Sequence, residues 1–191
     1  PYIPEKKYID IVDPSIALSQ DEMYEMFEHI LLKRDVSDLT KVKLLKKLYD
    51  VHVREVDTYV EEFFTTLKRL SILEDSIIII TSDHGDEFNE HGGLSHDDKM
   101  YSELIDIPLL IYDPKREESR ICHNLVSNID IPPTILYLFG LSPEKTFEGY
   151  SLLPVESYPQ KGCFGEALYH EPGRGEDIER DIYFYREGDL K

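Results

Sequence analysis

Residues 76–81 read SIIIIT, and their four consecutive isoleucines decide the fold class. Apolar residues that do not alternate with polar ones indicate a strand covered on both faces, as in a parallel sheet between helices. A second run of this kind, IPLLIY, occupies residues 107–112. The sequence therefore predicts an α/β fold, a layered sandwich in which helices flank a mostly parallel central sheet.

Helical patterns lie on both sides of these strands. Within residues 41–70 the apolar positions recur every three or four residues, which predicts one long amphipathic helix. Residues 128–140 predict another helix, with Pro132 and Pro133 in its first turn and Gly140 at its end. The alternation of helices and strands supports the layered α/β class.

The two ends of the chain carry weaker signals. Residues 1–14 contain three prolines and predict an extended or irregular lead-in. Ser19 followed by Glu22 has the pattern of a capping box at a helix start. Short strands are expected at residues 163–168 and 182–185.

Composition excludes several classes of function. The 191 residues include 39 acidic and 21 basic side chains, so the formal net charge is −18. A surface of this charge repels nucleic-acid phosphates and anionic lipids. No apolar run approaches the roughly 18 residues of a membrane span. Cys122 and Cys163 lack C-x-x-C spacing, which slightly favours a reduced, cytoplasmic setting.

The candidate site directly follows the isoleucine strand, where the sequence continues Ser82, Asp83, His84, Gly85. Ligands of open α/β sheets gather just beyond the carboxyl ends of strands. A neighbouring carboxylate and imidazole at that position can together bind one divalent cation. A mixed oxygen and nitrogen shell suits zinc or manganese, and a carboxylate-rich shell suits magnesium or calcium.

A simple turn is the alternative interpretation of Asp83 to Gly85. In that case the aspartate caps the turn, the glycine takes the left-handed conformation and the histidine is incidental. Three of the seven histidines in the chain fall within residues 84–96, which favours a site instead. The acidic residues of the same loop, Asp86, Glu87 and Glu90, are expected to include solvated surface charges.

The run at residues 77–114, with Thr-Ser-Asp-His-Gly at its centre, resembles a signature region of the sulfatase family, within the alkaline-phosphatase superfamily. Residues 1–4, 48–73, 128–136 and 148–154 resemble further segments of that family in the same order. The resemblance implies an alkaline-phosphatase-like fold that is incomplete at both ends. Residues 1–191 would be the C-terminal portion of the catalytic domain, with a lead-in and helix at 1–40, an α/β part with the metal loop at 41–154, and C-terminal strands at 155–191.

The resemblance also implies roles for individual residues. Asp83 and His84 match ligands of one divalent metal ion, which could be Ca, Mg, Mn or Zn. His96 and Lys99 match catalytic residues that contact the anionic ester group of a small-molecule sulfate or phosphate ester. His91 is expected either to contact the substrate or to support the loop.

The family nucleophile, a formylglycine made from the Cys or Ser of a Cys/Ser-x-Pro-x-Arg motif, is expected upstream, because that motif does not occur in this chain. We therefore expect the intact parent to hydrolyse sulfate esters and the chain alone to be inactive. Two alternatives remain open. One is a phosphoric ester or phosphonate hydrolase, or a phosphoglycerol transferase, of the same superfamily. The other is a non-catalytic metal- or ligand-binding domain.

Overall fold

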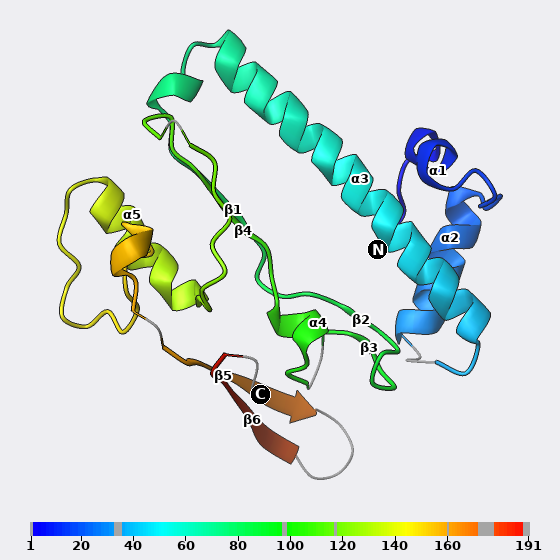
Figure 1. The fold of residues 1–191 in the computed structure, drawn as a ribbon. Coiled ribbons are helices and arrows are strands. Elements are labelled where there is room, and N and C mark those ends of the chain that lie inside the picture. Colours follow the sequence, from blue (N-terminus) through cyan, green and yellow to red (C-terminus); the bar gives the residue numbers. More distant parts are fainter. Residues whose placement is uncertain are drawn as a thin grey trace. The chain divides into compact units, whose positions relative to one another are not determined.

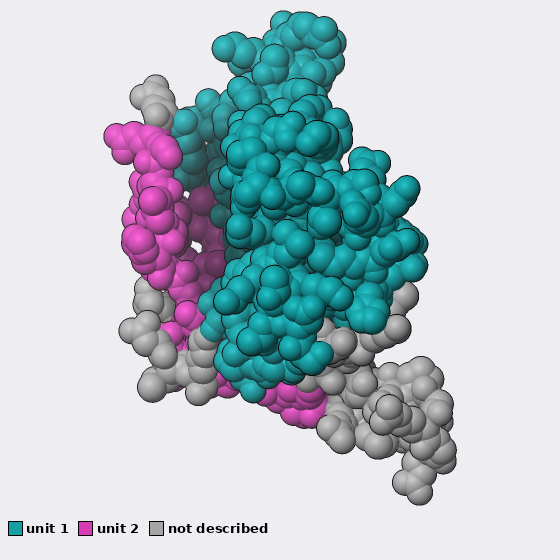
Figure 2. All heavy atoms as spheres, turned by 90° about the vertical axis from the view of Figure 1, so that its right-hand side faces the viewer, with its two compact units in different colours: residues 1–117 teal, residues 118–191 magenta. Residues whose placement is uncertain are grey.

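The computed structural model describes residues 2–32, 36–96, 99–116, 118–159, 161–171 and 178–188. The chain divides into two compact units, residues 1–117 and residues 118–191 (Figure 2). The internal boundaries expected from the sequence, at residues 40 and 154, stay predictions. Among the described residues, no helix combines the length and the apolar character needed to cross a membrane.

Unit 1 contains helices, a strand pair and a small hairpin (Figure 1). Its elements in chain order are α1 (Lys6–Val12), α2 (Gln20–Phe27), a π-helical turn (Glu28–Leu32), α3 (Leu39–Arg69), a 3-10 helix (Leu73–Asp75), β1 (Ile78–Thr81), β2 (Glu87–Phe88), β3 (Leu94–Ser95), α4 (Ser102–Ile105) and β4 (Leu109–Tyr112).

Helix α3 is the scaffold of unit 1, and it confirms the long amphipathic helix expected from the sequence. Its 31 residues span about 46 Å at 1.5 Å per residue. The carboxylate of Asp38 accepts hydrogen bonds from the backbone N–H groups of Thr40 and Lys41 and caps the first turn. Lys68 and Arg69 in the last turn complement the negative end of the helix dipole.

The buried face of α3 forms two hydrophobic clusters with the segments around it. One cluster joins it to α1 and α2 through Tyr8, Ile9, Ile16, Met23, Leu48 and Val51. The other joins it to the π-helical turn and to β3 through Ile30, Val42, Leu45 and Leu94. Leu94 belongs to the loop that follows β1, so burying its side chain ties the candidate site to the helical core.

The expected capping box at the start of α2 is confirmed. Ser19 accepts a hydrogen bond from the backbone of Glu22, and the Glu22 carboxylate accepts one from the Ser19 backbone. The expectation of an irregular lead-in is wrong for Lys6–Val12, which forms α1. Pro4 and Pro14 flank this helix and do not interrupt it, and the helix buries Tyr8 and Ile9 in the first cluster.

The isoleucine run forms β1 and the second apolar run forms β4, as expected, but the two strands pair antiparallel, with Ile78 opposite Tyr112 and Thr81 opposite Leu109. All three strand pairs in the described residues are antiparallel, so the expected parallel pairing does not occur among them. The prediction of parallel pairing rested on an apolar run covered on both faces, and such a run does not fix the direction of a strand. Within the described residues these isoleucines are only half-buried, and Ile77 is 36% exposed.

Unit 2 contains a 3-10 helix (Asn128–Asp130), α5 (Ile131–Leu138), a second 3-10 helix (Val155–Ser157) and a hairpin of β5 (Cys163–Glu171) and β6 (Ile178–Arg186). Helix α5 confirms the expected helix, with prolines in its first turn, and Gly140 follows its end at φ +69°. Asp130 is fully buried at the start of α5. Its carboxylate accepts hydrogen bonds from the backbone N–H of Tyr150, the hydroxyl of Tyr158 and the ammonium group of Lys161, which fastens these three residues to the helix start.

Candidate metal centre

The loop after β1 folds back on itself and on α4. Strands β2 and β3 pair through Glu87 opposite Ser95 and Phe88 opposite Leu94. The backbone N–H of Gly85 donates to the carbonyl oxygen of Leu104 in α4, at 2.8 Å. The loop therefore has defined hydrogen bonds at Gly85 and beyond it.

Gly85 is required by a close approach of two backbones. A Cβ atom at this position would lie 2.0 Å from the carbonyl oxygen of Glu103, far inside van der Waals contact. The positive-φ glycines of the described residues are Gly92, Gly140 and Gly188. The left-handed glycine of the simple-turn alternative is therefore not found at Gly85.

Changing Gly85 to alanine is expected to destabilise unit 1 by about 2 kcal/mol or more, because the new methyl group forces the loop away from α4. The measurement is urea-induced unfolding. Gly92→Ala is the matched control, since Gly92 has φ +80° and open space where its Cβ would lie, so only a conformational penalty of about 1 kcal/mol applies. Equal losses in the two variants would contradict the close-approach explanation.

Asp83 and His84 lie side by side and are open to solvent. The His84 Nε2 is 3.7 Å from the Asp83 Oδ2, and the side chains of His84 and Asp83 are 40% and 88% exposed. Hydrogen bonds from its own backbone N–H and from that of His84 hold the pKa of Asp83 below its ordinary value, as does the nearby His84 ring. The pair thus offers an ionised carboxylate next to an imidazole that a cation can reach.

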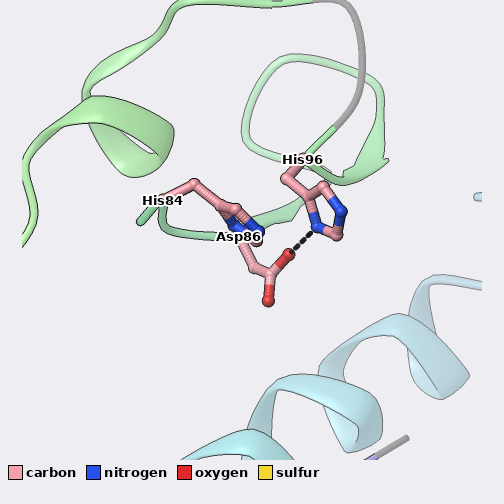
Figure 3. Close-up of side chains that lie close together, drawn as sticks. All are labelled: His84, Asp86 and His96. Carbon is pink, nitrogen blue, oxygen red and sulfur yellow. Dashed lines mark hydrogen bonds and ion pairs between the residues drawn. The ribbon is translucent and has the colours of Figure 1, made fainter. Parts of the chain in front are cut away.

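The structure brings His96 and Asp86 to the same place (Figure 3). The rings of His84 and His96 stack with centroids 3.9 Å apart, and the His96 Nδ1 is 3.1 Å from the Asp86 Oδ1. The second Asp86 oxygen accepts a hydrogen bond from the hydroxyl of Tyr2. One donor atom from each of His84, Asp86 and His96 lies within 4.8 Å of the others.

Asp86 is a member of this group that the sequence did not single out, since it was counted with the acidic residues that were expected to include solvated charges. Its side chain is only 12% exposed because it is held between Tyr2 and His96. The sequence feature that could have identified Asp86 as a candidate ligand is its position two residues after His84. In a chain with 39 acidic residues, that spacing alone does not distinguish a ligand from a surface charge.

His91 and Lys99 lie against a different group of side chains. The Lys99 ammonium is 2.7 Å from the Glu87 Oε2 and 3.2 Å from the His91 carbonyl oxygen. The His91 ring stacks on Tyr101 with centroids 3.7 Å apart, and its Nδ1 is 2.5 Å from a Glu103 oxygen. From the sequence, His91, His96 and Lys99 were expected to contact the substrate. Of these three residues, His96 is the one that lies beside His84.

Glu87 organises this second group and is not one of the solvated surface charges expected among the acidic residues of the loop. The residue is 1% exposed, and its Oε1 accepts hydrogen bonds from the backbone N–H groups of His91 and Gly93 at 2.8 Å each. Burial alone would raise the pKa of Glu87, but the bonds from Lys99, Gly93 and His91 outweigh it and hold that pKa below its ordinary value. The carboxylate is thus an internal anchor of the loop.

Comparison with known proteins assigns the chain consistently to one protein family. The family model described as Sulfatase matches residues 23–141. Arylsulfatase K of Homo sapiens is 32% identical over 132 residues, which are 69% of this chain and 24% of that protein. The Canis lupus familiaris protein of the same name is 34% identical over 61% of this chain and 22% of its own length. This chain therefore spans about a quarter of the length of these curated relatives.

Solved structures share the fold. Phosphonate monoester hydrolase SpPMH from Silicibacter pomeroyi matches with a TM-score of 0.63 and 25% identity, covering 69% of this chain and 27% of the other. BT4656, solved with its substrate D-Glucosamine-2-N, 6-O-disulfate, matches with a TM-score of 0.62 and 24% identity, covering 98% of this chain and 42% of the other. These matches confirm the alkaline-phosphatase-like α/β class. With the family model matching more than half of its residues, the chain belongs to the sulfatase family.

Proposed function

We propose that the intact parent of this chain hydrolyses sulfate esters with the help of one divalent cation. The observation that carries the proposal is the exposed Asp83–His84 pair directly after β1. A sulfate ester is negatively charged and repels a nucleophile, and a cation in this place would polarise its oxygens and offset that charge. Membership of the sulfatase family supports the same chemistry.

The donor chemistry of the pair fits such a cation. The lowered pKa of Asp83 keeps its carboxylate ionised, and the Nδ1 of His84 lies 2.9 Å from the Gly85 carbonyl oxygen, to which it can donate. That hydrogen bond fixes the ring and leaves the Nε2 lone pair for the metal. Calcium, magnesium, manganese and zinc all stay candidates, because the other ligands expected in the family are not part of this chain.

We propose His96 as the residue that contacts a non-bridging oxygen of the ester, since its ring lies on that of His84. Lys99 and His91 are proposed as further contacts to the anionic group. Both now face acidic partners, Glu87 and Glu103, so either would have to exchange that partner for the substrate. The chain alone is proposed to be inactive, since the formylglycine motif does not occur in its sequence.

The test is Asp83→Ala in the intact parent, with Asp10→Ala as the control because Asp10 is an exposed aspartate in α1 paired with Lys6. Asp83→Ala is expected to lower kcat/KM for an aryl sulfate by at least about 100-fold and to lower the bound metal measured by elemental analysis. Unchanged metal content and turnover in this variant would contradict the role proposed for Asp83, and a parent without turnover whose metal content is unchanged by Asp83→Ala would support the non-catalytic alternative.

The match to a phosphonate monoester hydrolase supports a second candidate, hydrolysis of phosphonate or phosphate esters. Sulfate, phosphate and phosphonate esters of the same phenol, compared in the same assay, distinguish the candidates. The proposal requires the sulfate ester to have the highest kcat/KM.

A further inference from the structure

Unit 2 contains a cavity of about 430 Å³ that has no part in the proposed function. Its lining includes His123, Asn124, Leu125, Lys161, Arg186 and Glu187. Cavities of this size bind small organic molecules, and a few well-placed polar groups orient the ligand. We propose that this cavity binds a small organic anion, whose acidic group lies against Lys161 and Arg186.

The two cations of the lining lie near one buried thiol. Arg186 stands opposite Cys163 in the β5–β6 pair, and directly opposed residues share one face of an antiparallel pair. Burial raises the pKa of the Cys163 thiol, and the positive charges of Lys161 and Arg186 both oppose that rise. Both side chains therefore lie close enough to act on the same group, which brings two positive charges to one cavity.

Lys161 has donors for a ligand. Among the described residues its ammonium group donates one hydrogen bond, to Asp130 at 2.8 Å, and an ammonium group has three N–H donors. The side chain is 21% exposed, and its nitrogen lies 4.7 Å from the centre of the Tyr150 ring. These contacts position the nitrogen before a ligand arrives, which lowers the ordering cost of binding.

Arg186 supplies the geometry for an acidic group. A guanidinium is planar, and its N–H groups form a fork that matches two oxygens of a carboxylate or a sulfate. The acidic residue of the lining is Glu187, and its carboxylate accepts a hydrogen bond from the Tyr185 hydroxyl at 3.2 Å. Tyr185 precedes Arg186 in β6, so the two side chains point to opposite faces of the hairpin. The Glu187 carboxylate is therefore held by a residue of the other face.

The size of the cavity indicates an organic anion. A bare sulfate or phosphate ion would leave most of the volume unfilled, whereas the side chain of Leu125 offers an apolar surface to a carbon skeleton. The Asn124 amide can donate to the acidic group without adding charge. The chain as a whole carries a net charge of −18, but salt screens distant charges and leaves the two cations of the lining to act on the ligand.

The experiment is titration of the chain with benzoate at low ionic strength, followed by calorimetry and by the NMR signals of the backbone amides. Benzoate is expected to bind at one site and to shift the amide signals of residues 123–125 and 186–188. Benzamide, which has nearly the same shape and no charge, is expected to bind at least about 10-fold more weakly, because hydrogen bonds between two charged groups are the stronger ones. Inorganic sulfate is expected to displace benzoate, since its oxygens take the place of the carboxylate.

Substitutions locate the site. Arg186→Gln is expected to weaken benzoate binding by about 10-fold or more, and Lys161→Gln likewise. Arg120→Gln is the matched control, because Arg120 is a half-exposed arginine of unit 2 that pairs with Glu156. His96→Gln, in the candidate metal centre of unit 1, should also keep the wild-type affinity. Circular dichroism of each variant checks its fold, and Arg186→Gln still tests the proposal if Lys161→Gln unfolds because Asp130 loses its partner.

Several results would overturn the proposal. One is the absence of benzoate binding by the folded chain, and another is benzamide binding as tightly as benzoate. A loss in Arg120→Gln equal to that in Arg186→Gln would show only a general effect of charge. Binding lost in His96→Gln and kept in Arg186→Gln, or sulfate that binds without displacing benzoate, would place the anion elsewhere. None of these measurements depends on turnover or on bound metal, so the proposed function stands or fails separately.

Discussion

Replacing Glu87 with alanine is expected to lower the free energy of unfolding of unit 1 by about 3 kcal/mol, because a buried ion pair loses one partner. The Lys99 side chain is 25% exposed and would keep its charge with little water to replace the carboxylate. The backbone N–H groups of His91 and Gly93 would also lose their acceptor. Urea-induced unfolding measures the loss.

Two variants separate the causes of this effect. Glu87→Gln keeps an oxygen acceptor and removes the charge, so it is expected to fall between wild type and alanine. Glu61→Ala, on an exposed position of α3, should change the free energy of unfolding by less than about 0.5 kcal/mol. A Glu87→Ala protein as stable as Glu61→Ala would show that the buried pair does not stabilise the loop.

Lowering the pH should reduce the free energy of unfolding of unit 1, as substitution of Glu87 does. The pKa of Glu87 in the folded protein lies below its unfolded reference of 4.5, so the unfolded chain takes up the proton first as the pH falls. The stability from Glu87 is therefore complete above pH 4.5 and is lost as the pH falls through the folded pKa. Glu87→Gln should lack this part of the pH dependence.

Asp130→Ala is expected to have the largest effect in unit 2, about 4 kcal/mol. The carboxylate is fully buried and its hydrogen bonds come from four groups, the backbone N–H of Ser127 and of Tyr150, the Tyr158 hydroxyl and the Lys161 ammonium. Burial alone would raise the pKa of Asp130, but these bonds, of which that from Lys161 lowers the pKa most, instead hold it below its ordinary value. Removing the side chain leaves all four donors without this acceptor.

Amide hydrogen exchange in unit 2, together with thermal unfolding, measures the effect of Asp130→Ala. Exchange is expected to speed up across residues 150–158 and at the start of α5. Glu144→Ala, at an exposed position after α5, is the matched control and should leave exchange unchanged. Protection of residues 150–158 equal to that of wild type would show that Asp130 does not fasten this segment.

The sequence predicted the elements whose signals are local. Helix α3 follows from apolar periodicity, the start of α2 from Ser19 and Glu22, and the first turn of α5 from its two prolines. The position of the candidate site also followed from local order, because Asp83 and His84 come directly after a strand.

What the sequence did not predict depends on contacts between distant residues. The antiparallel pairing of β1 with β4 is set by how the intervening loop returns, and apolar runs carry no information on direction. The burial of Glu87 depends on Lys99, 12 residues away, and that of Asp86 on Tyr2, 84 residues away. In so acidic a chain, composition alone cannot identify which carboxylates turn inward.

Tyr2 connects the candidate metal centre to the helical core. Its ring packs edge-on against Phe27 and Tyr49 and lies beside both hydrophobic clusters, while its hydroxyl bonds to Asp86. Movement of the loop away from the core would therefore disturb the packing of Tyr2 against Phe27 of α2 and Tyr49 of α3. A change at Asp86 should therefore alter the surroundings of Tyr2 and of Tyr49 packed against it, and tyrosine absorption can report that change in a protein without tryptophan.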